Sequence, residues 1–104
     1  MFQSRQGDLF FEEVAAPPQK TKERKTPVLA YGEVTGHCHQ IKDFGGVALL
    51  EDDEAIYMHS SRNNIFVTHD EHGDIACPKN TWIKVTRQRE YDPLAAELER
   101  KVAD

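Results

Sequence analysis

The stretch that decides the fold of this 104-residue chain is VALLEDDEAIYMH, residues 47–59. Its two apolar segments, Val47–Leu50 and Ala55–His59, flank the acidic residues Glu51–Glu54. Short apolar runs on either side of a polar turn are typical of a β-hairpin. We therefore predict two strands here, joined by the acidic turn.

Similar short segments continue on both sides of this hairpin, separated by polar or glycine-containing turns. They cover residues 6–14, 28–34, 38–42, 65–68, 75–77 and 82–91. Many short strands with closely spaced turns indicate a sandwich or a small barrel. The sequence thus predicts an all-β fold, a small barrel or sandwich of about seven or eight short strands.

The last and longest of these strands alternates its side chains between two faces. Ile83 and Val85 mark the face that points to the core. Arg87 shares that face and is expected near the mouth of the core. There it would pair with Asp70 or Glu71, bind an anion or remain solvated.

A chain of 104 residues has room for one domain, which we assign to residues 1–104. Residues 15–27 interrupt the β pattern with prolines and a run of charges, so they are expected to form a surface loop or mobile arm. Residues 93–103 change to a helical period, because an apolar residue recurs at every fourth position from Leu94 to Val102. We predict a short C-terminal helix there.

Composition excludes several classes of protein. The formal net charge of −5 argues against a dedicated nucleic-acid binder, which would usually carry a basic face. No apolar run approaches the roughly 20 residues of a membrane span, and the first residues lack the apolar core of a signal peptide. The cytoplasm is therefore expected, where Cys38 and Cys77 would remain free thiols.

Four histidines carry the most chemical information in the chain. His37 and His39 are two residues apart, so on a strand both rings point to the same side. His69 and His72 follow a later strand where it runs into a turn. If that strand end lies beside the first pair, the four imidazoles form a nitrogen-rich metal site.

The predicted cofactor is a divalent transition metal: zinc, iron, nickel or manganese, among which the sequence does not choose. Three protein ligands would leave a position open for chemistry, whereas four would close the site. Whether the protein is an enzyme stays open. If it is one, Glu71 is the candidate general base.

The sequence resembles two known protein families at these residues. Gly32, the His37-x-His39 pair and Asp43 resemble the first metal motif of the cupin superfamily. That resemblance implies a cupin-like barrel in which His37, His39 and Asp43 bind a metal together with either His69 or His72.

The second resemblance covers most of residues 6–93. It consists of QGD at 6–8, GEVTGHxH at 32–39, HxEHG at 69–73 and RQREYDP at 87–93. This frame resembles a family of short bacterial and phage proteins of unassigned function. It implies a bacterial or phage cytoplasmic origin and brings no activity with it.

Taken together, the residues predict a small cytoplasmic metal-binding β-barrel protein with a histidine-rich site. The alternative is a non-enzymatic interaction module whose histidines are structural. In that case the 15–27 arm or the C-terminal helix would contact another protein. A third option is a nucleic-acid accessory protein that uses the basic residues of 20–25.

Overall fold

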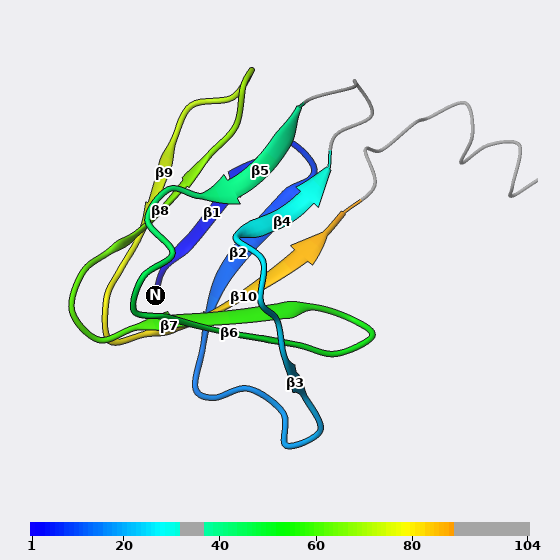
Figure 1. Cartoon of the computed structure of the whole chain (residues 1–104), viewed down its shortest axis with the longest axis vertical. Coiled ribbons are helices and arrows are strands. Elements are labelled where there is room, and N and C mark those ends of the chain that lie inside the picture. Colours follow the sequence, from blue (N-terminus) through cyan, green and yellow to red (C-terminus); the bar gives the residue numbers. More distant parts are fainter. Residues whose placement is uncertain (32–36, 89–104) are drawn as a thin grey trace, which may run out of the picture.

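The computed structural model describes residues 1–31 and 37–88 of the chain, and every structural statement below concerns these residues (Figure 1). They form ten strands in two antiparallel sheets. The strands are β1 (Gln3–Gln6), β2 (Leu9–Val14), β3 (Lys22–Glu23), β4 (Val28–Tyr31), β5 (Cys38–Ile41), β6 (Val47–Glu51), β7 (Ile56–Ser60), β8 (Ile65–Thr68), β9 (Ile75–Cys77) and β10 (Trp82–Arg87). The all-β prediction is confirmed.

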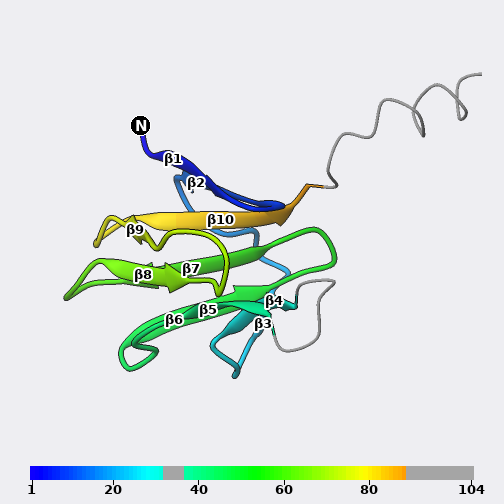
Figure 2. The same cartoon turned by 90° about the horizontal axis from the view of Figure 1, so that it is seen from above.

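The larger sheet has six strands in the order β1-β2-β10-β7-β6-β3, which Figure 2 follows from β1 and β2 through β10 to β7 and β6. The hairpin predicted at 47–59 is confirmed, because β6 and β7 pair antiparallel with Leu49 opposite Met58. β10 lies between β2 and β7, with Arg87 opposite Leu9 at one end. This pairing joins the two ends of the sequence.

The smaller sheet has four strands in the order β4-β5-β8-β9. β5 pairs with β8 so that Gln40 lies opposite Thr68 and Ile41 opposite Val67. One step further along the same antiparallel register, His39 comes next to His69. The register of one strand pair therefore brings the two halves of the histidine pattern together.

One hydrophobic core holds the two sheets. It includes Leu9, Phe11, Leu49, Met58, Ile83 and Val85 from the larger sheet and Leu29, Ile41, Ile65, Val67 and Cys77 from the smaller one. Phe11, Met58 and Ile83 are completely buried. Since each such side chain contributes roughly 1.5–3 kcal/mol on burial, this shared core is the main link between the sheets.

Three details of the predicted architecture are wrong. The described residues form ten strands, whereas about seven or eight were predicted. Of the two proposed forms, the barrel does not hold, because the ten strands described here form separate sheets that do not close. Residues 6–14 were expected to be one strand, but the chain reverses at Gly7 and Asp8 to make the β1–β2 hairpin. Gly7 adopts a φ of 58°, which favours glycine and allows so tight a turn.

Other expectations fall partly outside the described residues. The predicted C-terminal helix at 93–103 lies entirely outside the described residues. The last residues of the strands predicted at 28–34 and 82–91 also lie outside them. Residues 15–27 run over the surface and contribute β3, whose Lys22 pairs with Glu51 of β6. Within residues 1–31 and 37–88, the structure has no helix with the length and apolar character needed to cross a membrane.

Candidate functional site

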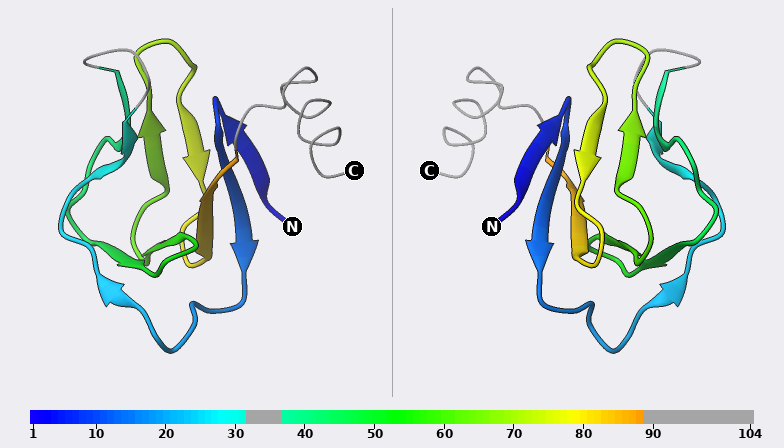
Figure 3. Two further views of the ribbon diagram at one scale, coloured as in Figure 1. Left: turned by 90° about the vertical axis from the view of Figure 1, so that its right-hand side faces the viewer. Right: turned by 90° about the vertical axis from the view of Figure 1, so that its left-hand side faces the viewer.

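The four histidine rings of the sequence pattern lie together at one end of the molecule. The ring centroids of His39 and His69 are 4.3 Å apart, and those of His69 and His72 are 4.6 Å apart. His37 is 6.1 Å from His69, and His72 is 6.3 Å from His39. The four rings therefore lie close together, as the sequence pattern predicts. Figure 3 shows the β8–β9 turn at the same end as the β1–β2 turn.

His39 is the buried member of the cluster, with 2% of its surface exposed. Its Nδ1 lies 2.8 Å from Oε1 of Gln6 in β1. The Gln6 amide nitrogen donates to the carbonyl oxygens of Val67 and Gly73, both at 2.9 Å. Because these two bonds orient the amide, Gln6 presents only an acceptor to His39, and the proton must sit on Nδ1.

The second nitrogen of His39 faces a carboxylate from the β1–β2 turn. Nε2 of His39 lies 3.3 Å from Oδ1 of Asp8. The other Asp8 oxygen accepts a hydrogen bond from Nε of Arg87 at 2.5 Å, and Nη2 of Arg87 donates to the carbonyl oxygen of Tyr31 at 2.8 Å. Arg87 thus lies near the mouth of the core, but its acidic partner is Asp8.

Burial and neighbouring charges set the protonation of this pair. Burial, together with the charge of His69, lowers the pKa of His39 despite the opposing effect of Asp8. Burial alone would raise the pKa of Asp8, but its hydrogen bond and charge interaction with Arg87 outweigh burial and lower that pKa. Both shifts favour a neutral imidazole beside an ionised carboxylate.

Gly7 leaves room for two of the histidines. A Cβ atom at this position would lie 2.8 Å from Nε2 of His72 and 3.3 Å from Cε1 of His39. The β1–β2 turn therefore packs directly against these rings. A side chain at Gly7 would enter the space that they share.

His69 has a different role from His39 in this arrangement. Its Nδ1 accepts hydrogen bonds from the backbone N–H groups of Glu71, at 3.0 Å, and His72, at 3.3 Å. A ring nitrogen that accepts carries no proton, so the neutral ring holds its proton on Nε2. His69 thus stabilises the turn that presents His72.

The outer rim of the cluster holds the remaining predicted site residues. Nδ1 of His37 lies 3.2 Å from Oε1 of Glu71, whose side chain is 59% exposed. His72 is exposed as well. In the described part of the chain, no three His, Cys, Asp or Glu side chains form a group that could hold a metal ion. This agrees with the orientation of His69 and His37, whose Nδ1 atoms face the backbone and Glu71 respectively.

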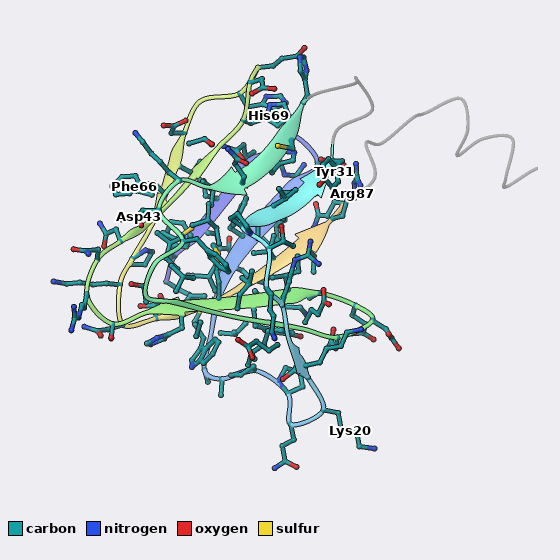
Figure 4. The ribbon with its side chains drawn as sticks, in the orientation of Figure 1. Lys20, Tyr31, Asp43, Phe66, His69 and Arg87 are labelled. Atoms are coloured by element: carbon teal, nitrogen blue, oxygen red, sulfur yellow. The ribbon has the colours of Figure 1, made fainter. Side chains whose placement is uncertain are left out.

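Asp43, a metal ligand by the cupin resemblance, does not join the cluster. It follows the far end of β5, and its Oδ1 accepts a hydrogen bond from the backbone of Gly45. Figure 4 shows Asp43 well apart from His69, whereas Tyr31 and Arg87 lie side by side. Asp43 lies beyond the end of β5 at Ile41, and no group in the described part of the chain that could hold a metal ion includes it, so the ligand set implied by the cupin resemblance is not supported.

A family model described as a domain of unknown function (DUF8820) matches residues 5–88. The chain belongs to the DUF8820 family. No curated protein and no solved structure matches it. The predicted membership of a family without an assigned function is thus confirmed. The matched range includes both turns of the candidate site, and the side chains of Arg5 and Gln88 at its two ends are hydrogen-bonded to each other.

Sequence reasoning missed three side chains of this DUF8820 site: Gln6, Asp8 and Arg87 were not assigned to it. The QGD segment at 6–8 was noticed only as part of a resemblance. A glycine followed by aspartate is a signal of a two-residue hairpin turn, and it would have moved Gln6 and Asp8 from a strand to a strand end. Nothing local pairs Asp8 with Arg87, which is 79 residues away.

Proposed function

We propose that this domain binds a divalent transition metal at the histidine cluster, with His37, His39, His69 and His72 as the candidate ligands. The observation that carries the proposal is the bond between Nδ1–H of His39 and Gln6. A histidine that binds a metal through one ring nitrogen almost always donates a hydrogen bond from the N–H of its other ring nitrogen to a carbonyl or carboxylate. This hydrogen bond fixes the tautomer of the ring. The Gln6 bond leaves the Nε2 lone pair of His39 directed away from the backbone.

The surroundings of His39 strengthen this interpretation. A buried histidine that served only as a hydrogen-bonding brace would need a donor for its Nε2 lone pair. The polar atom that faces Nε2 is instead an acceptor, Oδ1 of Asp8, at 3.3 Å. Two acceptors that face each other are stabilised by a cation between them.

The metal is zinc, iron, nickel or manganese, since imidazole nitrogens suit all of these. Catalysis is a separate question. If the protein is an enzyme, Glu71 is the candidate general base, because its exposed carboxylate lies beside His37 at the rim of the cluster.

The decisive experiment is elemental analysis of the full chain purified without a polyhistidine tag. We expect near-stoichiometric metal in the wild type and its loss in a His37→Ala, His39→Ala double variant. His59→Ala is the matched control, because the His59 ring packs against Trp82 at a centroid distance of 5.0 Å instead of joining the cluster. A wild type that holds none of the four metals, even after incubation with each, contradicts the proposal.

A second candidate is an interaction module whose histidines are structural. The observation in its favour is His69, whose Nδ1 is used by two backbone N–H groups. A groove beside the 15–27 segment, lined by Glu23, Arg24, Phe44 and Val47 among others, offers a contact surface. This candidate predicts that the melting temperature of the protein is unchanged by chelators and by added metal.

A further inference from the structure

We propose that the outer face of the smaller sheet is the surface on which a second copy of this chain docks. The face consists of the outward side chains of β4, β5, β8 and β9. The side chains that alternate with them, such as Ile41 and Val67, belong to the core. The proposal does not depend on whether the histidine cluster binds a metal.

The strands of the smaller sheet contain no charged residue. Asp, Glu, Lys and Arg make up 30% of the sequence, yet none of them occurs in β4, β5, β8 or β9. The larger sheet, in contrast, carries charged residues within its strands, such as Glu12 and Lys84. Because a charged group is costly to remove from water, the smaller sheet is the face that a protein partner covers at the lower cost.

Two large hydrophobic side chains are exposed on this face. Phe66 of β8 is 46% exposed, and Tyr31 of β4 is 69% exposed. The strand register places Tyr31 beside Cys38 and Phe66 beside Ala76. Figure 4 shows Phe66 and Tyr31 toward opposite sides of the smaller sheet. Aromatic side chains on a surface depleted of charge are typical of the centre of a protein–protein interface.

The charged residues that flank the face favour a second copy as the partner. Lys42 follows β5, and its backbone N–H donates to the carbonyl oxygen of Phe66 at 2.9 Å. Asp70 follows the opposite end of β8, and both Lys42 and Asp70 are exposed. A twofold axis that runs across the strands would therefore place Lys42 of each copy against Asp70 of the other. Such an axis generates an isologous dimer, in which one patch serves both subunits.

The charge of the whole chain also restricts how two copies can meet. The formal net charge is −5, so two copies repel each other over most of their surfaces. The uncharged face of the smaller sheet avoids this repulsion, and the two Lys42–Asp70 pairs add attraction at its ends. A second copy therefore fits this face better than it fits the larger sheet.

The size of the face limits the strength of the dimer. Four strands about 4.8 Å apart, each about 13 Å long, provide a contact of only a few hundred Å² per copy. Stable complexes bury about 800 Å² per partner. We therefore expect a weak dimer that forms at high protein concentration, with a Kd of about 0.1–1 mM.

The test is sedimentation equilibrium of the full chain from about 10 µM to about 2 mM, a range that spans the expected Kd. A chelator is present so that metal ions do not bridge exposed histidines of two copies. The average mass should rise from monomer towards dimer. Phe66→Lys should weaken association more than about 10-fold, because it buries a charge in the interface. Ala48→Lys is the matched control, since it adds the same charge at an exposed strand position of the larger sheet.

Two further sets of variants separate the interface from folding. Gln40→Lys adds a charge at an exposed position of the same face without removing an apolar side chain, and it should weaken association as Phe66→Lys does. Urea unfolding confirms that each variant is folded. Lys42→Asp should also weaken association, and the charge swap of Lys42→Asp with Asp70→Lys should restore it to within a few-fold of the wild type.

Each of the other outcomes overturns part of the proposal. A wild type that stays monomeric at the highest concentration rejects a second copy as the partner and leaves the face to a different protein. Unchanged association of folded Phe66→Lys and Gln40→Lys shows that the copies meet elsewhere. An equal loss in Ala48→Lys shows that added charge acts without regard to position. Failure of the charge swap to restore association rejects the pairing of Lys42 with Asp70.

Discussion

The Nδ1 atom of His39 in β5 lies 2.8 Å from Oε1 of Gln6 in β1, and this contact joins the two sheets through a buried polar network. Gln6 is 2% exposed, and its amide also reaches the carbonyl oxygens of Val67 and Gly73. One side chain therefore connects the N-terminal hairpin, β5 and both ends of the β8–β9 turn. Both polar atoms of the Gln6 side chain have partners, so burying this amide carries no penalty for an unsatisfied group.

Gln6→Leu should lower the free energy of unfolding by about 2–4 kcal/mol. The substitution leaves His39, Val67 and Gly73 with polar groups that have lost a partner, and each buried unsatisfied group costs about 1–3 kcal/mol. Urea unfolding measures the change. Gln3→Leu on the same strand is the control, since Gln3 is exposed. Equal stability of the two variants would contradict the importance of the network.

Gly7→Ala should cost more stability than Gly46→Ala. Both glycines have positive φ, 58° and 81°, so the backbone penalty of about 1–2 kcal/mol is shared. A Cβ at Gly46 meets nothing within 4 Å, whereas one at Gly7 lies 3.3 Å from the buried His39 ring and 2.8 Å from Nε2 of His72. Thermal melting of both variants tests the difference.

The same pair of variants also separates packing from metal binding. Displacement of His72, a proposed ligand, by the new methyl group should weaken metal binding in Gly7→Ala and leave it unchanged in Gly46→Ala. If the two variants melt alike and bind metal alike, the contact between the β1–β2 turn and the histidines has no energetic consequence.

Cys77 should resist thiol reagents in the folded protein while Cys38 reacts. Both are free, but Cys77 is completely buried, and burial raises the pKa of its thiol to about 12. Only the thiolate reacts readily, so labelling of Cys77 requires opening of the fold. Titration with a chromogenic disulfide should give one fast equivalent in buffer and two in denaturant. Two fast equivalents from the folded wild type, or one fast equivalent from folded Cys38→Ser, would contradict this.

Asp52 should make the stability depend on pH in the acid range. Backbone N–H groups of Ala55 and Glu54 donate to its Oδ1 at 2.9 and 2.8 Å, and they lower the pKa of its carboxyl below the ordinary value of 3.8. A group with a lowered folded pKa stabilises the protein above its unfolded pKa, and the effect is lost as the pH falls through the folded value.

Asp52→Asn keeps an acceptor for these N–H groups but removes the charge. Its free energy of unfolding should therefore fall less steeply below about pH 4 than that of the wild type. Asp53→Asn, an exposed neighbour in the same turn, should keep the wild-type slope. Parallel slopes for wild type and Asp52→Asn in acid urea titrations would show that Asp52 does not contribute.

Local patterns predicted several elements well. β8 and β9 have the predicted bounds of 65–68 and 75–77. The core side of β10 is also as expected, since Ile83 and Val85 are buried. These features depend on alternation and turn chemistry within a few residues, which the sequence displays directly.

The N-terminal hairpin shows where local reasoning ends. Residues 6–14 contain enough apolar side chains for one strand, and only the positive φ of Gly7 divides them into β1, a turn and β2. That turn places Gln6 and Asp8 at the site. Their partners His39, Val67 and Arg87 are 33 to 79 residues away, and no local pattern encodes such distances.

By itself, the sequence determined that the chain forms short strands and that His37 and His39 project from one stretch of it, because side-chain alternation has a period of two residues. The tertiary structure alone decided that β5 lies beside β8, that the sheets stay open, and that Gln6 and Asp8 flank His39. Those outcomes depend on which strands pair and on how two apolar faces share one core. Such choices are made between distant segments, where each strand's pattern fits more than one partner.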